Sequence, residues 1–496
     1  MHLGMLLEMA SDGMQDRVAV GAVVDGWSFG ELALRARRVA SWLRDSPGDR
    51  VVLIDLNSNA IPLTLFGAAL AGKPFVPVNY RLTDEQLRAI VARTAPSTVI
   101  VGDGVTERIS GLEGITIRSR AELLAASMDE DAEQLDGWSG DPEDIAVLLF
   151  TSGTTGEPKA AVLRHKNLAS YVVGTVEFAS AGPDDAAVVS VPSYHIAGIS
   201  AVVTSAFCGR RVVYLESFEA TEWVAAVRYE NITNAMVVPT MLTRILDVLE
   251  DDGLGLPTLR ALSYGGGPMP LAVIERAMKL LPDVGFVNAY GLTETSSTVS
   301  VLGPDDHRAA FTSDDPAVRL RLSSVGRPLE SLEVSIRNED GQPVAPGERG
   351  EIWVRGEQVA GEYLGRELTD DAGWFRTRDA GSIDDEGYLF VFGRLDDVIV
   401  RGGENLSPGE IEAVLLEHEA IADAAVVGVP DVQWGERVVA VVVLHDGASA
   451  TEKELRDMVR ARLRSTKTPE TITFRSDLPY NETGKLLRRV LREELA

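Results

Sequence analysis

Cysteine, positive charge and long apolar runs are all scarce in this chain of 496 residues. The single cysteine, Cys208, excludes an intrachain disulfide and any structural metal site built on cysteines, and it fits a reducing compartment. Lys and Arg number 47 against 75 Asp and Glu, and the net charge of −28 argues against nucleic-acid or anionic-membrane binding across the whole surface. Apolar runs such as 437–444 are too short to span a bilayer, and the first residues lack the basic start of a secretory signal. A cytoplasmic protein is predicted.

Short β-branched runs alternate with amphipathic stretches over most of the chain. The predicted buried strands are 51–55, 98–101, 187–191, 211–215 and 235–238, and the predicted helices are 29–44, 84–94, 221–230, 240–250 and 271–281. This alternation predicts doubly wound α/β layers with parallel sheets. Beyond residue 320 the pattern changes to short predicted strands at 325–337, 350–355 and 387–393, separated by turn-forming dipeptides such as Asp340-Gly341. This pattern predicts an antiparallel β-subdomain.

The end of the chain forms a unit of its own after the polar segment 393–410. Its predicted elements are helix 408–418, strands 423–429 and 437–444, helix 451–464 and strand 471–475. The sequence therefore predicts a large domain over 1–394 and a small α+β domain over 395–496.

The segment 151–159, TSGTTGEPK, carries the strongest local chemical signal. It follows the apolar run 145–150, so it begins at the end of a predicted strand. Glycine permits a sharp turn that points backbone N–H groups inward, and the hydroxyls and the terminal Lys159 add donors and positive charge. That composition is typical of a loop that wraps a polyphosphate, although the Walker A spacing is absent. The alternative is an ordinary surface turn.

Six further segments follow in a fixed order: 192–198 (PSYHIAG), 265–270 (GGGPMP), 290–294 (YGLTE), 374–381 (WFRTRDAG), 393–412 (GRLDDVIVRGGENLSPGEIE) and 479–488 (PYNETGKLLR). With TSGTTGEPK they resemble the adenylate-forming superfamily of acyl- and aryl-CoA synthetases, peptide-synthetase adenylation domains and luciferases. The resemblance covers nearly the whole chain. It implies an AMP-binding domain with an acyl pocket, a mobile C-terminal domain, and the use of ATP, Mg²⁺ and coenzyme A.

The resemblance also implies roles for residues on the nucleotide side. Tyr290 stacks on adenine, Thr293 binds phosphate, and Glu294 ligates Mg²⁺. Asp379 accepts both ribose hydroxyls, and Arg394 contacts ribose or phosphate. The other implied nucleotide contacts are Thr151, Ser152, Gly153, Thr154, Thr155, Lys159, Gly265, Gly266, Gly267, Asn288 and Gly291.

Arg378 stands where the family usually has glycine, directly before the ribose aspartate. Three interpretations are open: its side chain contacts phosphate or the C-terminal domain, it narrows the site, or it is solvated without a role. The lysine motif also departs from the family pattern, with Tyr480 and Glu482 in place of a small residue and a proline.

The catalytic residues implied by the resemblance are Lys485, Glu294, Thr151 and His195. Lys485 stabilises the charge that builds up when a carboxylate attacks the α-phosphate. His195 resembles the aromatic residue or histidine that gates the acyl pocket in the family. The six histidines show neither metal spacing nor a Ser-His-Asp set. Asp396 is the implied hinge. The implied coenzyme A side comprises Arg401, Gly402, Gly403 and Trp434.

The predicted function is an ATP-dependent acyl-CoA ligase that forms an acyl-adenylate and then a thioester by domain alternation. Its partners are a small carboxylic acid and coenzyme A, with a monocarboxylic, largely apolar acid preferred and a homodimer possible. One alternative is an enzyme that performs mainly one half-reaction, either thioesterification of a preformed adenylate or adenylation for a carrier-protein thiol. A more distant alternative is a non-catalytic nucleotide-binding protein.

Overall fold

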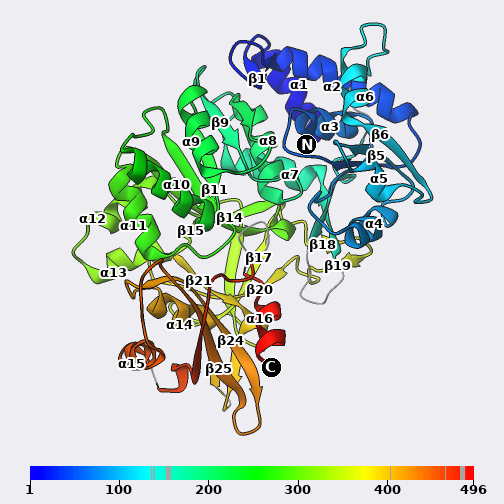
Figure 1. Ribbon diagram of the computed structural model, residues 1–496. Helices are drawn as coiled ribbons and strands as arrows, with labels where there is room; N and C mark the ends of the chain where they lie inside the picture. The colour runs from blue at the N-terminus through cyan, green and yellow to red at the C-terminus, as the bar shows by residue number, and fades with distance from the viewer. Residues whose placement is uncertain (136, 138–139, 152–157, 403, 464, 481–485) are drawn as a thin grey trace.

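The computed structural model describes residues 1–135, 137, 140–151, 158–402, 404–463, 465–480 and 486–496. Two large sheets and their helices form the upper part of Figure 1, and the C-terminal segment lies below them in orange and red. A four-stranded sheet lies between these two parts of the molecule. Among the described residues, no helix is both long enough and apolar enough to cross a membrane.

The eight-stranded sheet has the order β19-β18-β8-β7-β4-β3-β5-β6. Its strands are β3 (Arg50–Ile54), β4 (Phe75–Pro77), β5 (Ser97–Val101), β6 (Ile115–Ser119), β7 (Ile145–Thr151), β8 (Lys159–Arg164), β18 (Glu362–Tyr363) and β19 (Arg366–Glu367). The helices nearby in sequence are α2 (Phe29–Asp45), α3 (Ala60–Leu70), α4 (Asp84–Ala92), α5 (Thr106–Ile109) and α6 (Arg120–Met128). Helix α2 begins after a capping box, in which Ser28 and Glu31 bond each other's backbone N–H.

The nine-stranded sheet has the order β15-β14-β13-β12-β11-β9-β10-β1-β2. Its strands are β1 (Val18–Val20), β2 (Trp27–Ser28), β9 (Ala186–Val189), β10 (Arg211–Tyr214), β11 (Asn234–Val237), β12 (Ala261–Gly265), β13 (Gly285–Leu292), β14 (Ser297–Leu302) and β15 (Arg327–Pro328). The remaining helices of the large unit are α1 (Leu3–Gly13), α7 (His165–Thr175), α8 (Ile196–Cys208), α9 (Ala220–Tyr229), α10 (Pro239–Asp252), α11 (Leu271–Leu280), α12 (Pro304–Thr312) and α13 (Pro316–Arg319).

Parallel pairing holds through the middle of both large sheets, as the alternation of strands and helices predicted. Toward the edges of both sheets the pairing includes antiparallel pairs, among them β7 with β8 and β13 with β14. A short connection can join only antiparallel neighbours, whereas a parallel pair needs a crossover. Residues 152–158 join β7 to β8, and the 3₁₀ turn η1 (Thr293–Thr295) lies between β13 and β14. Glu294 therefore lies in a turn between two antiparallel strands, and Thr151 and Lys159 lie at the paired ends of β7 and β8.

The predicted antiparallel β-subdomain is the sheet β16-β17-β20-β21, in which every neighbouring pair is antiparallel. Its strands are β16 (Glu333–Arg337), β17 (Gly350–Arg355), β20 (Phe375–Ile383) and β21 (Leu389–Arg394). Strand β21 ends at Arg394, and the 3₁₀ turn η3 (Leu395–Asp397) leads into a different sheet. The large unit also contains the 3₁₀ turn η2 (Leu320–Ser323).

The C-terminal sheet has the α+β texture that the sequence predicted. Its strands are β22 (Ile399–Arg401), β23 (Glu404–Leu406), β24 (Ile421–Asp431), β25 (Gly435–Leu444) and β26 (Thr471–Arg475), and its helices are α14 (Pro408–Leu415), α15 (Glu452–Arg462), α16 (Arg488–Leu495) and the 3₁₀ turn η4 (Ser465–Lys467). Buried side chains from the β24–β25 pair fill a small core on each face, because successive residues of a strand point to opposite sides.

Helices α1, α3 and α8 lie outside the stretches predicted from amphipathic spacing. Every residue of α3 is buried, so this helix has no polar face to give a periodic signal. Leu3, Phe66 and Ile199, one from each helix, belong to a single buried cluster. These helices therefore form the core that joins the two large sheets.

Candidate active site

The β7–β8 hairpin brings the two ends of the TSGTTGEPK motif together. Thr151 ends β7 and is paired in register with Lys159, the first residue of β8. The Thr151 hydroxyl donates to the Lys159 carbonyl at 3.4 Å. Four predicted phosphate contacts in this motif, Ser152, Gly153, Thr154 and Thr155, lie outside the described residues.

Glu294 lies in η1 and is almost completely buried, with 9% exposure. Its carbonyl accepts hydrogen bonds from the N–H groups of Ala360 and Gly361 at 2.9 and 3.1 Å. Its Oε1 accepts a hydrogen bond from the Tyr363 hydroxyl at 2.5 Å. Burial, and then the neighbouring carboxylate, raise the pKa of Tyr363, so the phenol is a donor. The sequence analysis missed Tyr363, because no motif contains it and only its place on β18 brings it to Glu294.

Three of the predicted positions require small residues because backbone segments meet there. A Cβ at Gly265 would lie 2.3 Å from the Ala289 carbonyl oxygen, and one at Gly291 would lie 1.7 Å from that of Ser297. Gly266 has a φ of +80°, the left-handed region that favours glycine. Asn288, on the strand between these turns, donates from Nδ2 to the Ser324 carbonyl at 3.0 Å. The triple glycine, which ends with Gly267, therefore lies where β12 packs closely on β13.

Tyr290, Asp379 and Arg394, which the sequence predicts to contact adenosine, form one hydrogen-bonded group, called the predicted adenosine group below. The Tyr290 hydroxyl donates to Asp379 Oδ2 at 2.6 Å, and Arg394 Nη1 donates to Oδ1 at 3.1 Å. Arg394 and Asp379 are register partners on β21 and β20. Burial, and then the charge of Asp379, raise the pKa of Tyr290 well above its usual value. Three elements thus hold a carboxylate that is only 5% exposed.

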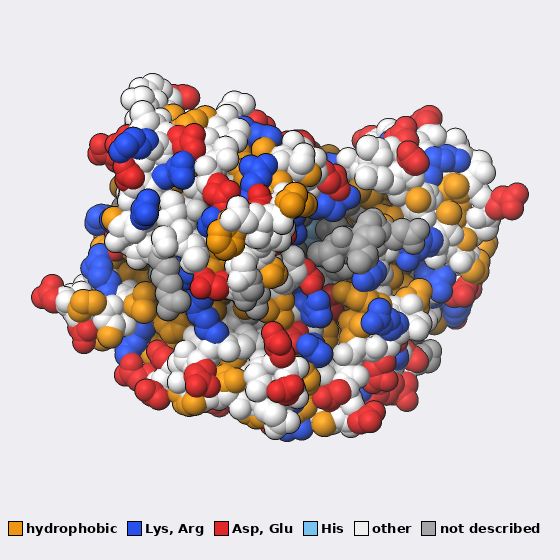
Figure 2. Space-filling view, turned by 90° about the horizontal axis from the view of Figure 1, so that it is seen from below, with side chains coloured by type: hydrophobic (Ala, Val, Ile, Leu, Met, Phe, Trp, Pro, Cys, Tyr) orange, Lys and Arg blue, Asp and Glu red, His pale blue; other side chains and the backbone are white. Residues whose placement is uncertain are grey.

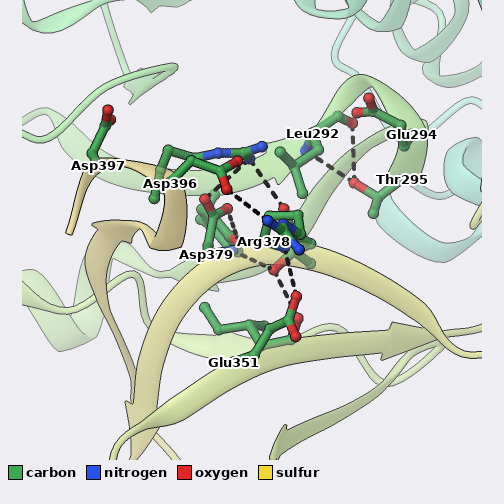
Figure 3. A network of polar contacts seen from close by, with 12 residues as sticks. Leu292, Glu294, Thr295, Glu351, Arg378, Asp379, Asp396 and Asp397 are labelled. Atoms are coloured by element: carbon green, nitrogen blue, oxygen red, sulfur yellow. Dashed lines mark hydrogen bonds and ion pairs between the residues drawn. The ribbon is translucent and has the colours of Figure 1, made fainter. Parts of the chain in front are cut away.

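Of the interpretations that the sequence left open for Arg378, the structure supports a contact with the C-terminal segment. Its Nη2 forms an ion pair with Oδ1 of Asp396, the predicted hinge residue, at 2.6 Å (Figure 3). Its φ is +64°, a left-handed conformation that is costly for any residue with a Cβ. The Arg378 N–H donates to the buried carboxylate of Glu351 at 3.2 Å. The side chain thus points toward the start of the C-terminal segment.

The carboxylates of Asp379 and Glu294 both affect the pKa of Arg394. Burial lowers the pKa of Arg394, but the carboxylates of Asp379 and Glu294 raise it further, and the net shift is upward. Figure 3 shows Glu294 and Thr295 beside the strand that carries Arg378 and Asp379. The face of the molecule in Figure 2 is hollowed between two lobes, with acidic and basic side chains interspersed around the hollow.

His195 is the N-cap residue of α8 and lies beside Tyr194, with ring centroids 4.7 Å apart. Burial lowers the pKa of His195 to about 4, so the ring is neutral at pH 7. Thr293 begins the η1 turn next to Glu294, and its carbonyl accepts the Ser296 N–H at 3.1 Å.

The predicted coenzyme A residues form a separate cluster on the C-terminal sheet. Arg401 donates to the Thr466 carbonyl at 2.7 Å and pairs with Glu470. The Gly402 N–H donates to the Trp434 carbonyl at 2.7 Å, and the Trp434 side chain is 45% exposed. The structure does not join this cluster to the predicted adenosine group by any contact between described residues. Gly403 and Lys485 lie outside the described residues.

Family models match most of the chain. The description "AMP-binding enzyme" matches residues 7–364, and "AMP-binding enzyme C-terminal domain" matches residues 410–485. The chain belongs to the AMP-binding enzyme family. The superfamily predicted from seven ordered motifs is therefore confirmed.

Relatives of this family member cover nearly its full length. A feruloyl-CoA synthase from Amycolatopsis sp. is 34% identical over 474 residues, covering 94% of this chain and 93% of the relative. A fatty acid–[acyl-carrier-protein] ligase, ScoC, from Streptomyces coeruleorubidus is 34% identical over 492 residues, covering 94% and 91%. The structure of the Bacillus subtilis o-succinylbenzoate CoA synthetase MenE with its acyl-adenylate intermediate superposes with a TM-score of 0.84 at 29% identity, covering 98% and 97%.

These comparisons confirm three predictions for this AMP-binding enzyme. The two-part α/β architecture, the status as an enzyme, and the acid–thiol ligase class agree with the family models and with the relatives. The roles of individual residues and the boundary at residue 394 stay predictions.

Proposed function

We propose that this AMP-binding enzyme activates a carboxylic acid with ATP as an acyl-adenylate and then transfers the acyl group to the thiol of coenzyme A. One observation carries the proposal: Tyr290 and Arg394 both donate hydrogen bonds to the carboxylate of Asp379, which is 5% exposed. Glu294 in turn is held beside the hairpin that begins with Thr151 and ends with Lys159. A site for ATP needs residues that bind the nucleoside and residues that bind the phosphates, and this proposal supplies both.

Asp379 binds the ribose hydroxyls in this proposal, because a carboxylate accepts two hydrogen bonds from a diol. Both of its oxygens already accept donors, from Tyr290 and Arg394, so these residues hold it before ribose arrives. Tyr290 supplies the ring for adenine. Binding to a prepared acceptor loses less entropy than binding to a mobile one.

The donor set fits a magnesium ion carried by the nucleotide. Magnesium prefers hard oxygen ligands and usually binds through one or two carboxylates together with substrate phosphates. Glu294 offers a nearly buried carboxylate, and its Oε2 receives no hydrogen bond from any described residue. When bound, the ion neutralises charge on the phosphates and orients them.

Adenylation joins a carboxylate oxygen of the acid to the α-phosphorus of ATP, and the bond to the bridging oxygen breaks as pyrophosphate leaves. Negative charge grows on the phosphoryl oxygens in the transition state. Lys485 stabilises that charge, and Lys159 and Thr151 hold the departing phosphates. His195 is neutral at pH 7 and gates the acyl pocket instead of acting as a base.

Thioesterification follows when the sulfur of coenzyme A attacks the acyl carbon and AMP leaves with the bonding electrons. The C-terminal segment, 395–496, rotates about Asp396 between the two steps, withdrawing Lys485 and presenting the cluster of Arg401, Gly402, Gly403 and Trp434. A mobile segment that is attached through a few residues can bring different residues to the same site for each of two reaction steps. A monocarboxylic, largely apolar acid, a cytoplasmic location and a homodimer complete the proposal.

Mass spectrometry of thioester products tests this function. The wild-type protein is incubated with Mg-ATP, coenzyme A and acids of short, medium and long chain, aryl and polycyclic type, beside Lys485→Ala and Lys453→Ala. Lys453 is the matched control, because it is an 88% exposed lysine of the same C-terminal segment. A thioester formed by wild type and Lys453→Ala but lost in Lys485→Ala supports the proposal. Thioesters from presynthesised adenylates alone would place only the second half-reaction here.

A carrier-protein thiol is the second candidate acceptor. Its support is the relative ScoC, which is a fatty acid–[acyl-carrier-protein] ligase by name. Adenylation would be unchanged, and only the thiol donor would differ. Acid-dependent pyrophosphate release without any coenzyme A thioester, together with acylation of an added holo-carrier protein, would favour this acceptor.

A further inference from the structure

Strand β18 lies beside the phosphate hairpin although it comes from a distant part of the chain. Tyr363 pairs with Ala161 of β8, and the Leu364 N–H donates to the Ala160 carbonyl at 2.9 Å. An ion pair between Arg164, at the end of β8, and Glu362 of β18, at 2.7 Å, joins the same two strands. The segment that carries Tyr363 is therefore fastened to β8 by backbone and side-chain contacts.

The same segment is fastened to η1. Ala360 and Gly361 donate their N–H groups to the Glu294 carbonyl, and Gly361 takes a φ of +52° to make this turn. The segment thus runs from the backbone of Glu294 to the backbone of Ala160. It therefore connects η1, which contains Glu294, to the start of β8.

Tyr363 repeats this connection through its side chain. Its hydroxyl donates to Glu294 Oε1 at 2.5 Å, and the Lys159 ammonium lies 5.6 Å from the centre of its ring. A hydrogen bond to one carboxylate oxygen fixes the rotation of the group and leaves Oε2 to face a ligand. The ring is a favourable neighbour for the lysine charge.

We propose that Tyr363 is a positioning residue that holds Glu294 in its metal-binding orientation and ties that ligand to the phosphate hairpin. The inference rests on the proposed role of Glu294 and adds a residue that no motif contains. Groups that hydrogen bond to a ligating carboxylate typically change metal affinity or activity by about 10- to 100-fold when they are removed. Tyr363 is the described residue placed to act in this way on Glu294.

The test measures binding of Mn²⁺ by electron paramagnetic resonance in the presence of saturating α,β-methylene ATP, which the enzyme cannot adenylate from. Tyr363→Phe keeps the ring and removes the hydroxyl. Tyr388→Phe is the matched control, because the buried Tyr388 also donates to a carboxylate, that of Asp306 at 2.7 Å, away from the phosphate hairpin. Glu294→Gln reports on the ligand itself.

We expect Tyr363→Phe to raise the Mn²⁺ dissociation constant about 10- to 100-fold. Metal-free AMP binding and the melting temperature should match those of Tyr388→Phe. In pyrophosphate exchange, the Mg²⁺ concentration for half-maximal rate should rise while kcat recovers at saturating Mg²⁺. A 3-fluorotyrosine at position 363, which keeps the hydroxyl, should bind Mn²⁺ like wild type even if the Phe variant is unstable.

Two results would overturn the inference, and they are distinguishable. If Glu294→Gln weakens Mn²⁺ binding but Tyr363→Phe stays within twofold of wild type, Tyr363 has no positioning role and the metal role of Glu294 stands. If Glu294→Gln also binds Mn²⁺ like wild type, the proposed metal ligand is wrong and the inference fails with it.

Discussion

Two aspartate–arginine pairs join the middle of β20 to the end of β21 and to the η3 turn, and they differ in burial. Asp379 binds Arg394, and those side chains are 7% and 28% exposed. Asp396 binds Arg378, and those side chains are 36% and 51% exposed. Arg378 and Asp379 are neighbours in the sequence, but they do not pair with each other. Arg378 pairs with Asp396 in the η3 turn (Figure 3), and Asp379 pairs with Arg394.

The two ion pairs consist of the same residue types, but their difference in burial changes how much each contributes to stability. Removing one partner of a buried pair leaves an uncompensated charge and costs about 3–5 kcal/mol, whereas an exposed pair contributes about 0–1 kcal/mol. The Asp379 pair is therefore suited to a fixed binding site. The Asp396 pair is suited to a contact that breaks when the C-terminal segment moves. Variants of each pair can test this contrast.

The largest effect is expected from Asp379→Ala. It removes the acceptor of Tyr290 and Arg394 and leaves the arginine partly buried without its partner. We expect about 3 kcal/mol of destabilisation in urea unfolding and about a hundredfold loss of AMP affinity by calorimetry. Asp379→Ala combined with Arg394→Met should recover stability but not affinity. An AMP affinity within tenfold of wild type would contradict a role for Asp379 in ribose binding.

A smaller effect is expected from Tyr290→Phe, which removes one donor from the Asp379 carboxylate and keeps the ring. A hydrogen bond to a charged group contributes about 1.5–3 kcal/mol, so AMP affinity should fall about tenfold or somewhat more. Calorimetric titration with AMP measures it. If Tyr290→Phe equals Asp379→Ala in its effect, then the phenol and not the carboxylate is the main ribose-side contact.

Acid should weaken the folded protein through His195, a predicted site residue whose pKa is lowered in the folded state. Burial lowers the pKa of His195 to about 4, while in the unfolded chain it is about 6.5. The unfolded state therefore takes up the proton first, and stability that is complete above pH 6.5 falls as the pH decreases toward 4. His195→Gln should remove about 1–2 kcal/mol of the loss between pH 7 and pH 5 in urea unfolding. An unchanged pH dependence would mean that His195 is protonated in the folded state as readily as in the unfolded one.

The sequence predicted many of the strands and the order of the motifs, because these depend on local periodicity and on contiguous residues. The helices that it predicted are α2, α4, α9, α10, α11, α14 and α15. The strand runs 98–101 and 471–475 match β5 and β26 within one residue. Helix α3 escaped prediction because it is buried on every side and so has no polar face.

Contacts between distant segments could not be predicted in the same way. Tyr363 reaches Glu294 only because β18 adds to the edge of β8, a pairing that no local pattern encodes. Arg378 was noticed as a departure from the family, but three interpretations were open until the fold placed Asp396 opposite it. A motif gives the identity of a residue, and the fold decides its partner.

The smallest effect on stability is expected from Arg378→Gly, and it isolates the exposed pair. Glycine removes an ion pair that contributes about 0–1 kcal/mol and also relieves a left-handed backbone that costs about 1–2 kcal/mol. Because glycine also costs about 0.5–1 kcal/mol in backbone entropy, these contributions nearly cancel, and unfolding stability should change by no more than about 1 kcal/mol. Asp396→Asn removes the ion pair alone, so the difference between the two variants measures the relieved backbone strain less this entropy cost.

The same two variants separate stability from domain movement. If the exposed pair holds the linker in the present pose, both should change the ratio of single-turnover adenylation to thioesterification rates by about two- to fivefold, the equivalent of less than 1 kcal/mol. The change should shrink in 0.5 M NaCl, because salt screens exposed charges. A shift in Arg378→Gly that is absent in Asp396→Asn and insensitive to salt would assign the effect to the backbone conformation. The effect of the Asp379 substitutions should depend little on salt, because that ion pair is less exposed. This difference in salt dependence separates the two pairs most clearly.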